Sequence, residues 1–244
     1  MYRVVIPARF GSTRLPGKAL IEVAGRTVLE WVYGRARASR AGEVVIATDD
    51  ERIAAAARGF RAEVEMTSAS HPSGMDRIAE VARARGWKGQ DIIVNLQGDE
   101  PLMPPSLIDQ VAELLESDKH ADIATLCAPI DAATELSDPN VVKVVCDRAG
   151  HALYFSRAPI PWNRDDPRTT RDANRHIGIY AYRVSALQRM TELPASRLER
   201  LEQLEQLRAL ENGLVIRVAA ARERPGADVN TREDLERVAR ELRG

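Results

Sequence analysis

The sequence contains only two cysteines and no excess of charge of either sign. Cys127 and Cys146 lie in apolar, strand-like segments, and two residues are too few for a disulfide framework or a four-cysteine zinc site. We therefore expect both thiols to be reduced and buried in the core. The 35 basic and 36 acidic residues give a formal net charge of -1, so no global field attracts nucleic acid or an anionic membrane. Any nucleotide must be bound by a local cluster of charges.

Long hydrophobic runs and the common hydrolase motifs are also missing. The apolar run near the N-terminus ends at Pro7, far short of the roughly 20 residues that a membrane helix needs, and it lacks a signal-peptide pattern. We therefore expect a cytoplasmic protein that does not contact a membrane. The sequence has no HExxH or CxxC motif and no Ser-His-Asp order, so it gives no support to a zinc enzyme or a hydrolase.

Strand-like and helix-like segments alternate over the first half of the 244 residues. The strand-like runs are residues 4–6, 44–47, 92–96 and 123–128, and the helix-like stretches are residues 28–39, 50–58, 75–85 and 105–117. This alternation favours an α/β fold with a mainly parallel central sheet flanked by helices. Ligands of such sheets bind at the carboxyl edge of the strands. Since there is no repeat or linker, we expect a single domain over residues 1–244.

The pattern changes after about residue 138. Strand-like runs at residues 141–146, 152–155 and 177–182 have no clear helices between them, which predicts an antiparallel ribbon sub-domain over about residues 138–195. Residues 159–175 are rich in Pro, Asp and Arg and predict a mobile, exposed loop, either a lid or a dimer arm.

A regular pattern returns near residue 196. A capping box, Ser196-x-x-Glu199, and the stop signal Asn212-Gly213 predict one helix over about residues 197–211. Its polar residues are expected on a solvated face, and its core-facing residues are Leu198, Leu201, Leu204, Leu207 and Leu210. A strand over residues 215–219 and a helix over about residues 232–242, capped by Thr231, complete the fold.

The first strand leads directly into the segment PARFGSTRLPGK at residues 7–18. Its glycines and prolines keep it out of a helix and let backbone N–H groups approach an anion, while cations and hydroxyls supply further donors. The candidate phosphate contacts are Arg9, Ser12, Arg14 and Lys18. The spacing matches neither the P-loop nor the GxGxxG pattern, and the alternative is a solvated basic loop.

Two acidic segments are candidates for a magnesium site. Asp99 follows a strand, and the preceding Gly98 allows a sharp turn toward the sheet edge. Asp228 and Asn230 alternate in an extended segment, so their side chains point to the same side. Mg²⁺ prefers one or two carboxylates together with phosphate oxygens and water. The alternatives are an aspartate that only shapes a turn and an asparagine that only caps one.

Three other polar segments have an ordinary interpretation beside a functional one. Residues 70–77 join a strand to a helix and could read a base edge or simply start the helix. Arg157 and Arg175 flank the ribbon and could clamp a carboxylate. His176 is read as a structural hydrogen-bonding residue rather than a catalytic base. No side chain is an obvious general base.

Eight segments in a fixed order resemble one known family, that of the 3-deoxy-manno-octulosonate (Kdo) cytidylyltransferases, or CMP-Kdo synthetases. They are PARFGSTRLPGK at 7–18, ATDD at 47–50, HPSGMDR at 71–77, VNLQGDEP at 94–101, VVKVV, ALYFSRAPIPW, RHIGIYAYR at 175–183 and LEQLEQLRALENG at 201–213. The resemblance implies a nucleotide-diphospho-sugar transferase fold, similar to glycosyltransferase A, and a homodimer. It implies that CTP and Kdo give CMP-Kdo and pyrophosphate with Mg²⁺, for the inner core of lipopolysaccharide.

The same resemblance assigns roles to individual residues. Lys18, Arg14 and Asp99 would be catalytic, and Asp99 would also ligate metal. The nucleotide would lie among Arg9, Ser12, Arg14, Lys18, Ser73, Arg77 and Gln97. The sugar acid would contact Arg157, His176, Tyr180, Glu205 and Gln206.

The chain departs from the family pattern at two places. Where the family usually has Gly-Val-Asp-Thr, this chain has Asp228-Val229-Asn230-Thr231, so an expected metal-binding aspartate is an asparagine. We expect Asp228 and Asn230 together to hold a metal with Asp99, more weakly than two carboxylates would. Met75 stands where the family usually has threonine. The other functions to weigh are a cytidylyltransferase for a related acidic or amino sugar and a nucleotide-binding protein without catalysis.

Overall fold

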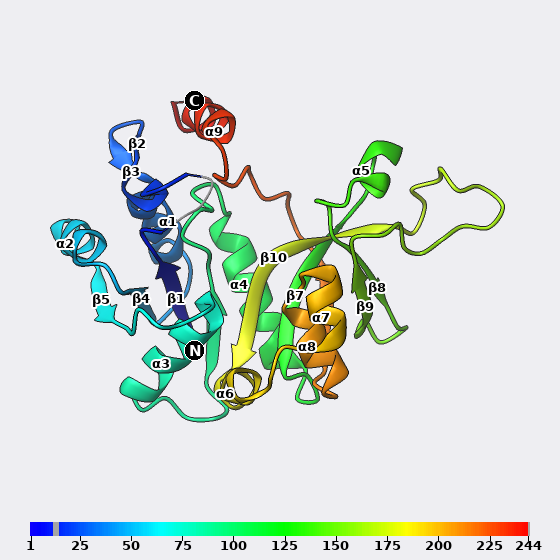
Figure 1. Ribbon diagram of the computed structural model, residues 1–244, viewed down its shortest axis with the longest axis horizontal. Coiled ribbons are helices and arrows are strands. Elements are labelled where there is room, and N and C mark those ends of the chain that lie inside the picture. The colour runs from blue at the N-terminus through cyan, green and yellow to red at the C-terminus, as the bar shows by residue number, and fades with distance from the viewer. Residues whose placement is uncertain (12–14, 244) are drawn as a thin grey trace.

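A computed structural model describes residues 1–11 and 15–243 of the chain. Its centre is a nine-stranded sheet whose main path runs β11-β7-β10-β6-β1-β4-β5, with β8 and β9 attached beside β10 (Figure 1). The main strands are β1 (Arg3–Ala8), β4 (Glu43–Thr48), β5 (Glu63–Met66), β6 (Ile92–Asn95), β7 (Ile123–Pro129), β10 (Asn174–Arg183) and β11 (Ile216–Ala220). The ribbon strands are β8 (Lys143–Cys146) and β9 (Ala152–Ser156), and a small separate hairpin consists of β2 (Glu22–Val23) and β3 (Arg26–Thr27).

Most neighbouring strands of the main path are parallel, as the sequence predicts. β6, β1, β4 and β5 pair in parallel, and so do β7 and β11. β10 pairs antiparallel with both β6 and β7. Residues 177–182, which we expected in the outlying ribbon, therefore belong to a central strand. The alternation of Ile and Tyr in that segment reflects two buried faces rather than one buried and one exposed face.

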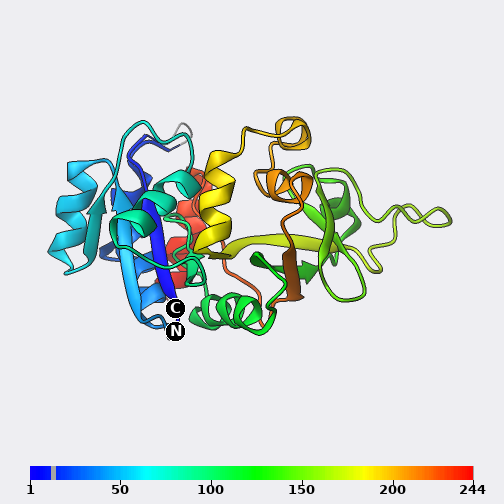
Figure 2. The ribbon, with the colours of Figure 1, turned by 90° about the horizontal axis from the view of Figure 1, so that it is seen from below.

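Helices cover both faces of the sheet. Val4 and Ile6 of β1 face one core cluster with α1 and α4, whereas Val5 faces a second cluster with α3, α6 and α8. α4 and α6 accordingly lie on opposite sides of β10 (Figure 2). The helices are α1 (Val28–Arg37), α2 (Glu51–Gly59), α3 (Gly74–Ala84), α4 (Pro105–Ser117), α5 (Ala133–Ser137), α6 (Val184–Glu192), α7 (Arg197–Glu202), α8 (Gln206–Glu211), α9 (Arg232–Arg243) and a short 3-10 helix η1 (Lys18–Leu20).

The ribbon extends the sheet on one side of the molecule. β8 pairs antiparallel with β9 and with the start of β10, and the chain between β9 and β10 projects as a long loop (Figure 1). Trp162 in this loop is 64% exposed. The structure therefore confirms that an exposed loop lies at the predicted place in the chain. In the part of the chain that the structure describes, no helix is long and apolar enough to cross a membrane.

The predicted helix over residues 197–211 is wrong in its continuity. The Ser196 capping box is present, but the chain turns at Gln203, whose φ of 53° is left-handed, and two short helices result. Leu201, in the first of these helices, is 69% exposed instead of facing the core. Glu199 and Glu202, expected on a solvated face, bond to Arg208 and Ser156 respectively.

Two further expectations need correction. Cys127 is buried as predicted, but Cys146 is exposed because it ends β8 at the open side of the ribbon. α6 lies inside the range assigned to a ribbon without helices, and it packs against α3 in the main body. The start of α9 is as predicted, since the Thr231 hydroxyl accepts a hydrogen bond from the backbone N–H of Asp234 at 3.2 Å.

Candidate active site

Three chain segments meet at the carboxyl edge of the parallel strands: the end of β1, the turn after β6 and the start of α3. They enclose a cavity of about 370 Å³ together with one residue before α8. The cavity is lined by Pro7, Ala8, Arg9, His71, Pro72, Ser73, Gly74, Arg77, Gln97 and Glu205. The structure thus brings together Arg9, Ser73, Arg77 and Gln97 of the predicted nucleotide residues, with Glu205 from the predicted sugar side. Ser12 and Arg14 lie outside the described residues.

Glycines allow these segments to pack closely on the end of β1. A Cβ atom at Gly98 would lie 3.0 Å from the carbonyl oxygen of Pro7, which is tighter than ordinary side-chain contacts. A Cβ atom at Gly74 would lie 3.3 Å from Pro7 Cγ. Glycine at both positions therefore brings the β6 turn and the first turn of α3 against the same strand end.

The ends of the cationic loop are held together. The N–H of Gly17 donates to the carbonyl oxygen of Phe10 at 3.0 Å, and Gly17 has a φ of 70°, which is unstrained only for glycine. The Arg52 guanidinium lies over the Phe10 ring, 3.4 Å from its centroid. Phe10 and Gly17 therefore lie side by side, and Lys18 follows at the site.

Lys18 links the two acidic segments. Its ammonium forms an ion pair with the Asp99 carboxylate and donates to the carbonyl oxygen of Val229 at 3.3 Å. The Val229 N–H donates to the carbonyl oxygen of Asp99 at 2.8 Å. The Asn230 side chain donates to the Asp228 carboxylate, so these two side chains do share one side of their segment. The turn after β6 and residues 228–230 are therefore joined around one cation.

Negative charge is crowded at this place. Glu100 Oε2 is inaccessible and has no hydrogen-bond partner in the described part of the chain. Burial, followed by the charges of Asp99 and Asp228, raises the pKa of Glu100 to about 8. Among residues 1–11 and 15–243, no preformed group of three or more His, Cys, Asp or Glu side chains has the geometry of a metal site. The crowding instead leaves an excess of acceptor oxygens beside Lys18.

The start of α3 presents its polar groups to the cavity. Ser73 is the N-cap, and its hydroxyl accepts from the Asp76 N–H at 3.3 Å and donates to the Asp76 carboxylate at 2.7 Å. Arg77 is 4% exposed; it donates to the Thr67 hydroxyl and lies 3.3 Å from Asp49 Oδ1. The helix-start and ligand-binding interpretations of this segment are thus compatible, since one turn serves both.

The predicted sugar-side residues lie in three places, of which Arg157 is described below. His176 and Tyr180 form a partly buried aromatic column with Tyr182, with centroid distances of 5.2 and 5.7 Å, and His176 Nε2 lies 2.9 Å from the Thr125 hydroxyl oxygen. Burial lowers the pKa of His176 to about 3, so its ring is neutral, and sugar binding by His176 and Tyr180 remains a prediction. Burial also raises the pKa of Glu205, which contacts Ser73 at the cavity. Gln206 begins α8 and is partly buried.

The guanidinium of Arg157, predicted as a carboxylate clamp, is bound to protein acceptors in this structure. Its guanidinium donates to the carbonyl oxygens of Glu202 at 2.6 Å, Pro139 at 2.8 Å and Gln203 at 3.3 Å. The fully buried Lys143 donates to three carbonyl oxygens, including that of Arg157 at 2.6 Å. The Arg157 contacts fasten the ribbon to the turn between α7 and α8, whereas the Lys143 contacts join carbonyl groups within residues 138–157. Sugar binding by Arg157 remains a prediction.

A second cavity, of about 270 Å³, is lined by Asp228 and the three residues before it, together with parts of β7, α5 and β10. Arg224 forms an ion pair with Asp131, and Arg175 lies 3.9 Å from Glu135. The charges of its lining thus compensate one another, and it contains none of the predicted nucleotide residues. We therefore expect the nucleotide in the first cavity, which is lined by Arg9, Arg77 and Gln97.

Comparison with known proteins decides the family. A sequence profile described as cytidylyltransferase matches residues 3–219. A 3-deoxy-manno-octulosonate cytidylyltransferase of Thioalkalivibrio sulfidiphilus is 52% identical and covers 99% of both chains. The chain belongs to this family. Another member, from Halorhodospira halophila, is 53% identical over 99% of this chain and 96% of its own.

The family fold is confirmed by a solved structure of high similarity. A CMP:2-keto-3-deoxy-manno-octonic acid synthetase, solved in complex with CTP, superposes with a TM-score of 0.91 at 40% identity, covering 100% of this chain and 99% of its own. The expected nucleotide-diphospho-sugar transferase architecture is therefore correct for this chain.

Several residues of the site were given no role from the sequence, although three of them lie in segments that resemble the family. Asp49, in ATDD, and Thr67 hold Arg77; Glu100, in VNLQGDEP, lies beside Asp99; and Lys143, in VVKVV, joins three carbonyl groups within residues 138–157. Asp49 follows a strand at the carboxyl edge, as Asp99 does, and this position is the one signal that could have marked it. Lys143 in the apolar VVKVV segment could have been noticed as a charge that must be buried.

Proposed function

We propose that the protein transfers CMP from CTP to the anomeric hydroxyl of Kdo, giving CMP-Kdo and pyrophosphate. The observation that carries this proposal is the position of Lys18, which joins Asp99 and the 228–230 segment next to a cavity lined by Arg9 and Arg77. Cations at one side and carboxylates at the other suit a nucleoside triphosphate and a hard metal ion. Family membership supports CTP and Kdo as the substrates.

The reaction is an in-line displacement at the α-phosphorus of CTP. The sugar hydroxyl forms the new P–O bond, the bond to the β-phosphate breaks, and pyrophosphate leaves on the opposite side. The protein has little covalent chemistry to perform, so fixed cations supply most of the transition-state stabilisation. Arg9 and Lys18 neutralise phosphate charge, and Arg77, Ser73 and Gln97 hold the nucleotide in the cavity. Glu205 and Gln206 orient the sugar acid.

Magnesium fits the donor set at the 228–230 segment. The carboxylates of Asp99 and Asp228, the amide oxygen of Asn230 and Oε2 of Glu100, which has no hydrogen-bond partner among the described residues, are hard oxygen donors, the type that Mg²⁺ prefers. We infer that Asp99, Asp228 and Asn230 hold the ion. When bound, it polarises phosphate oxygens and offsets the charge that develops on them. Lys18 keeps Asp99 in place before the substrates arrive.

Three broader properties belong to the same proposal. The enzyme acts as a homodimer in the cytoplasm and supplies activated Kdo for lipopolysaccharide. A related acidic or amino sugar is the alternative substrate, because the sugar side is defined by few charged contacts. A nucleotide-binding protein without catalysis is the other alternative, for which Asn230 is the one suggestive feature.

The test is pyrophosphate release from CTP with Mg²⁺ and a panel of sugar acids, including Kdo, its 8-amino analogue and a nine-carbon ulosonic acid. We expect the highest kcat/KM with Kdo and at least a tenfold lower value with UTP or ATP in place of CTP. A preference for another sugar acid would replace Kdo in the proposal. Binding of CTP without turnover on any sugar acid would favour the non-catalytic alternative.

A further inference from the structure

Asp49 occupies a place that the proposed chemistry does not use. It directly follows β4, and its Oδ1 is a buried oxygen without a hydrogen bond of proper alignment in the described part of the chain. That oxygen is 3.3 Å from Nη2 of Arg77, close enough for an ion pair. The side chain of Arg77 is 5% exposed, so its charge is almost completely removed from water.

An arginine buried in this way needs acceptors, because its guanidinium stays charged in proteins. Two are present: Asp49 at the end of β4 and Thr67 just after β5. The two strand ends are themselves joined by the N–H of Thr67, which donates to the carbonyl oxygen of Thr48 at 2.9 Å. The acceptors therefore form one rigid support for the guanidinium.

Arg77 also lines the cavity that holds Arg9, Ser73 and Gln97. A guanidinium carries five N–H groups in a fixed plane. Contacts from two of its nitrogens to fixed acceptors set the direction of that plane and leave further N–H groups for an acceptor in the cavity. We propose that Asp49 is a positioning residue that, with Thr67, orients Arg77 toward the bound nucleotide. This inference rests on the proposed nucleotide-binding role of Arg77.

The test is equilibrium binding of CTP, measured by calorimetry without any sugar acid, together with steady-state kinetics. In Asp49→Asn the shape is kept and the charge is removed. We expect the Kd and the KM for CTP to rise about tenfold, as the loss of a charge-assisted contact predicts, while kcat and the KM for the sugar acid change less than threefold. Asp49→Glu restores the charge and should recover part of the affinity.

The matched control is Glu51→Gln. Glu51 is two residues away and exposed, its ion-pair partner is Arg58, and the substitution removes the same charge. It should leave the Kd within a factor of two. Equal weakening by Glu51→Gln and Asp49→Asn would overturn the proposal, because long-range charge would then explain both.

A purely structural role is separated by stability. If Asp49→Asn lowers the melting temperature but keeps the wild-type Kd at temperatures where it is folded, the proposal is wrong. Should this variant not fold, Thr67→Val removes the other acceptor and must raise the Kd for CTP about threefold. An unchanged Kd would again refute the proposal. If wild-type protein does not bind CTP, the proposed function fails first. If the wild-type protein binds CTP and the variants bind it with the same Kd, this inference alone fails.

Discussion

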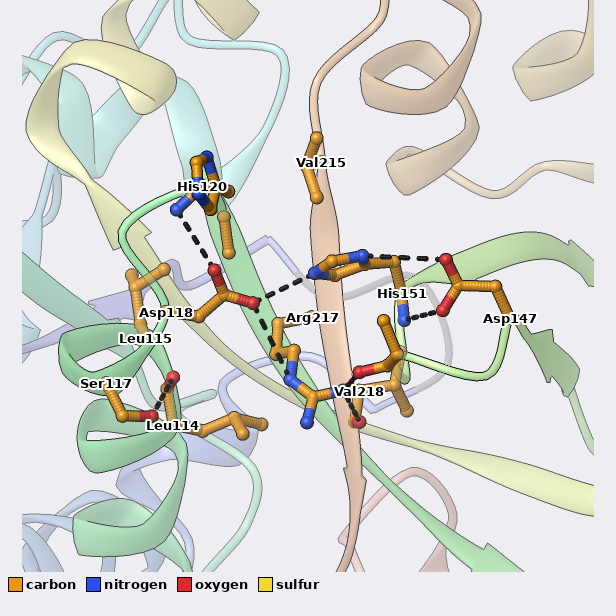
Figure 3. Close-up of polar contacts among 12 residues, drawn as sticks. Leu114, Leu115, Ser117, Asp118, His120, Asp147, His151, Val215, Arg217 and Val218 are labelled. Carbon is orange, nitrogen blue, oxygen red and sulfur yellow. Dashed lines mark hydrogen bonds and ion pairs between the residues drawn. The ribbon is translucent and has the colours of Figure 1, made fainter.

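Polar side chains at the carboxyl edge and at the amino edge of the central sheet differ in how completely they are hydrogen-bonded. At the carboxyl edge of β4 and β6, the buried oxygens of Asp49, Asn95 and Glu100 have no hydrogen-bond partner in the described part of the chain. The amino edge of β7 and β11 carries a comparable polar cluster around Asp118 and His151 (Figure 3). β7 runs in the same direction as β6, because β10 is antiparallel to both, so this cluster lies at the end of the sheet opposite the cavity.

At the amino edge, protein groups satisfy one another. Asp118 Oδ2 lies 2.9 Å from His151 Nε2 and 3.7 Å from Arg217 Nε, while Oδ1 accepts from the N–H of His120 at 3.0 Å. The N–H of His151 donates to Asp147 at 2.8 Å (Figure 3). Buried polar groups are normally satisfied in this way. The contrast indicates that the amino edge stabilises the fold. At the carboxyl edge, Asp49 supports Arg77, while the oxygens of Asn95 and Glu100 are kept for ligands at a cost in stability.

The largest expected effect is at Lys18. Replacing Lys18 with Ala removes a cation that contacts both Asp99 and Val229, so transition-state charge is no longer offset. We expect kcat/KM to fall by about 10² to 10³ with little change in the melting temperature. Lys88→Ala, at an exposed position, is the control and should behave as wild type. Near-normal CMP-Kdo formation by Lys18→Ala would remove Lys18 from the site.

The opposite pattern is expected at Asp118. Asp118→Ala leaves His151 and Arg217 without their shared acceptor and should lower the free energy of unfolding by about 1–3 kcal/mol. Chemical denaturation measures this loss. kcat/KM at a temperature where the variant is folded should stay within twofold of wild type. A tenfold loss of activity in folded protein would show that the two edges are not separate in function.

Acid should weaken the fold through His176. Its pKa is about 3 in the folded chain and about 6.5 when unfolded, so between these values the unfolded chain binds a proton that the folded chain does not. Stability is therefore lost as the pH falls below about 6.5, by about 2 kcal/mol at pH 5 at most.

His176→Gln keeps a hydrogen-bonding group and removes this titration. We expect its free energy of unfolding, measured without substrates, to fall less between pH 7 and pH 5 than that of wild type. Asp118 does not interfere in this window: its hydrogen bond with His151 lowers its pKa, so its contribution is present above about 4 and is lost only at lower pH. Equal pH dependence of the two proteins would show that His176 is not held neutral.

The smallest effect concerns magnesium. Asn230→Asp adds a second carboxylate next to Asp228 and should lower the half-saturating Mg²⁺ concentration several-fold. Initial rates over a Mg²⁺ titration measure it, with Asp228→Asn as the opposite change, which should raise the value. An unchanged half-saturating concentration in Asn230→Asp would count against residue 230 as a ligand.

Local patterns predicted those parts of the fold that depend on local chemistry. β-Branched runs marked β1, β4 and β7, and the Ser196 capping box marked the start of α7. The break at Gln203 was missed because it depends on long-range contacts: Arg157, from another strand, donates to the carbonyl oxygens of Glu202 and Gln203. Such contacts can hold a non-glycine residue in a left-handed conformation that propensity disfavours.

The central position of β10 was missed for a similar reason. Periodicity shows that Tyr180 and Ile179 face opposite sides, but it does not say whether a helix covers each side. The candidate site was more predictable, because polar residues after strands converge at one edge whatever the order of the strands. Lys18, Asp99 and Val229 come from three distant segments and meet at this edge. The contacts of Arg157 with the α7–α8 turn and of Asp49 with Arg77 depend on tertiary structure, so neither contact was predicted.

Because Lys143 is buried, chemical labelling of its amine can show when the structure around it opens. Its only other lysines are Lys18, Lys88 and Lys119, and the last two are exposed. Lys143 donates to the carbonyl oxygens of Asp138, Val141 and Arg157, so reagent reaches its amine only when the structure around these groups opens. In an amine-labelling time course, Lys88 and Lys119 would be modified at once. Delayed modification of Lys143 would then time the opening of the ribbon around these three carbonyl groups.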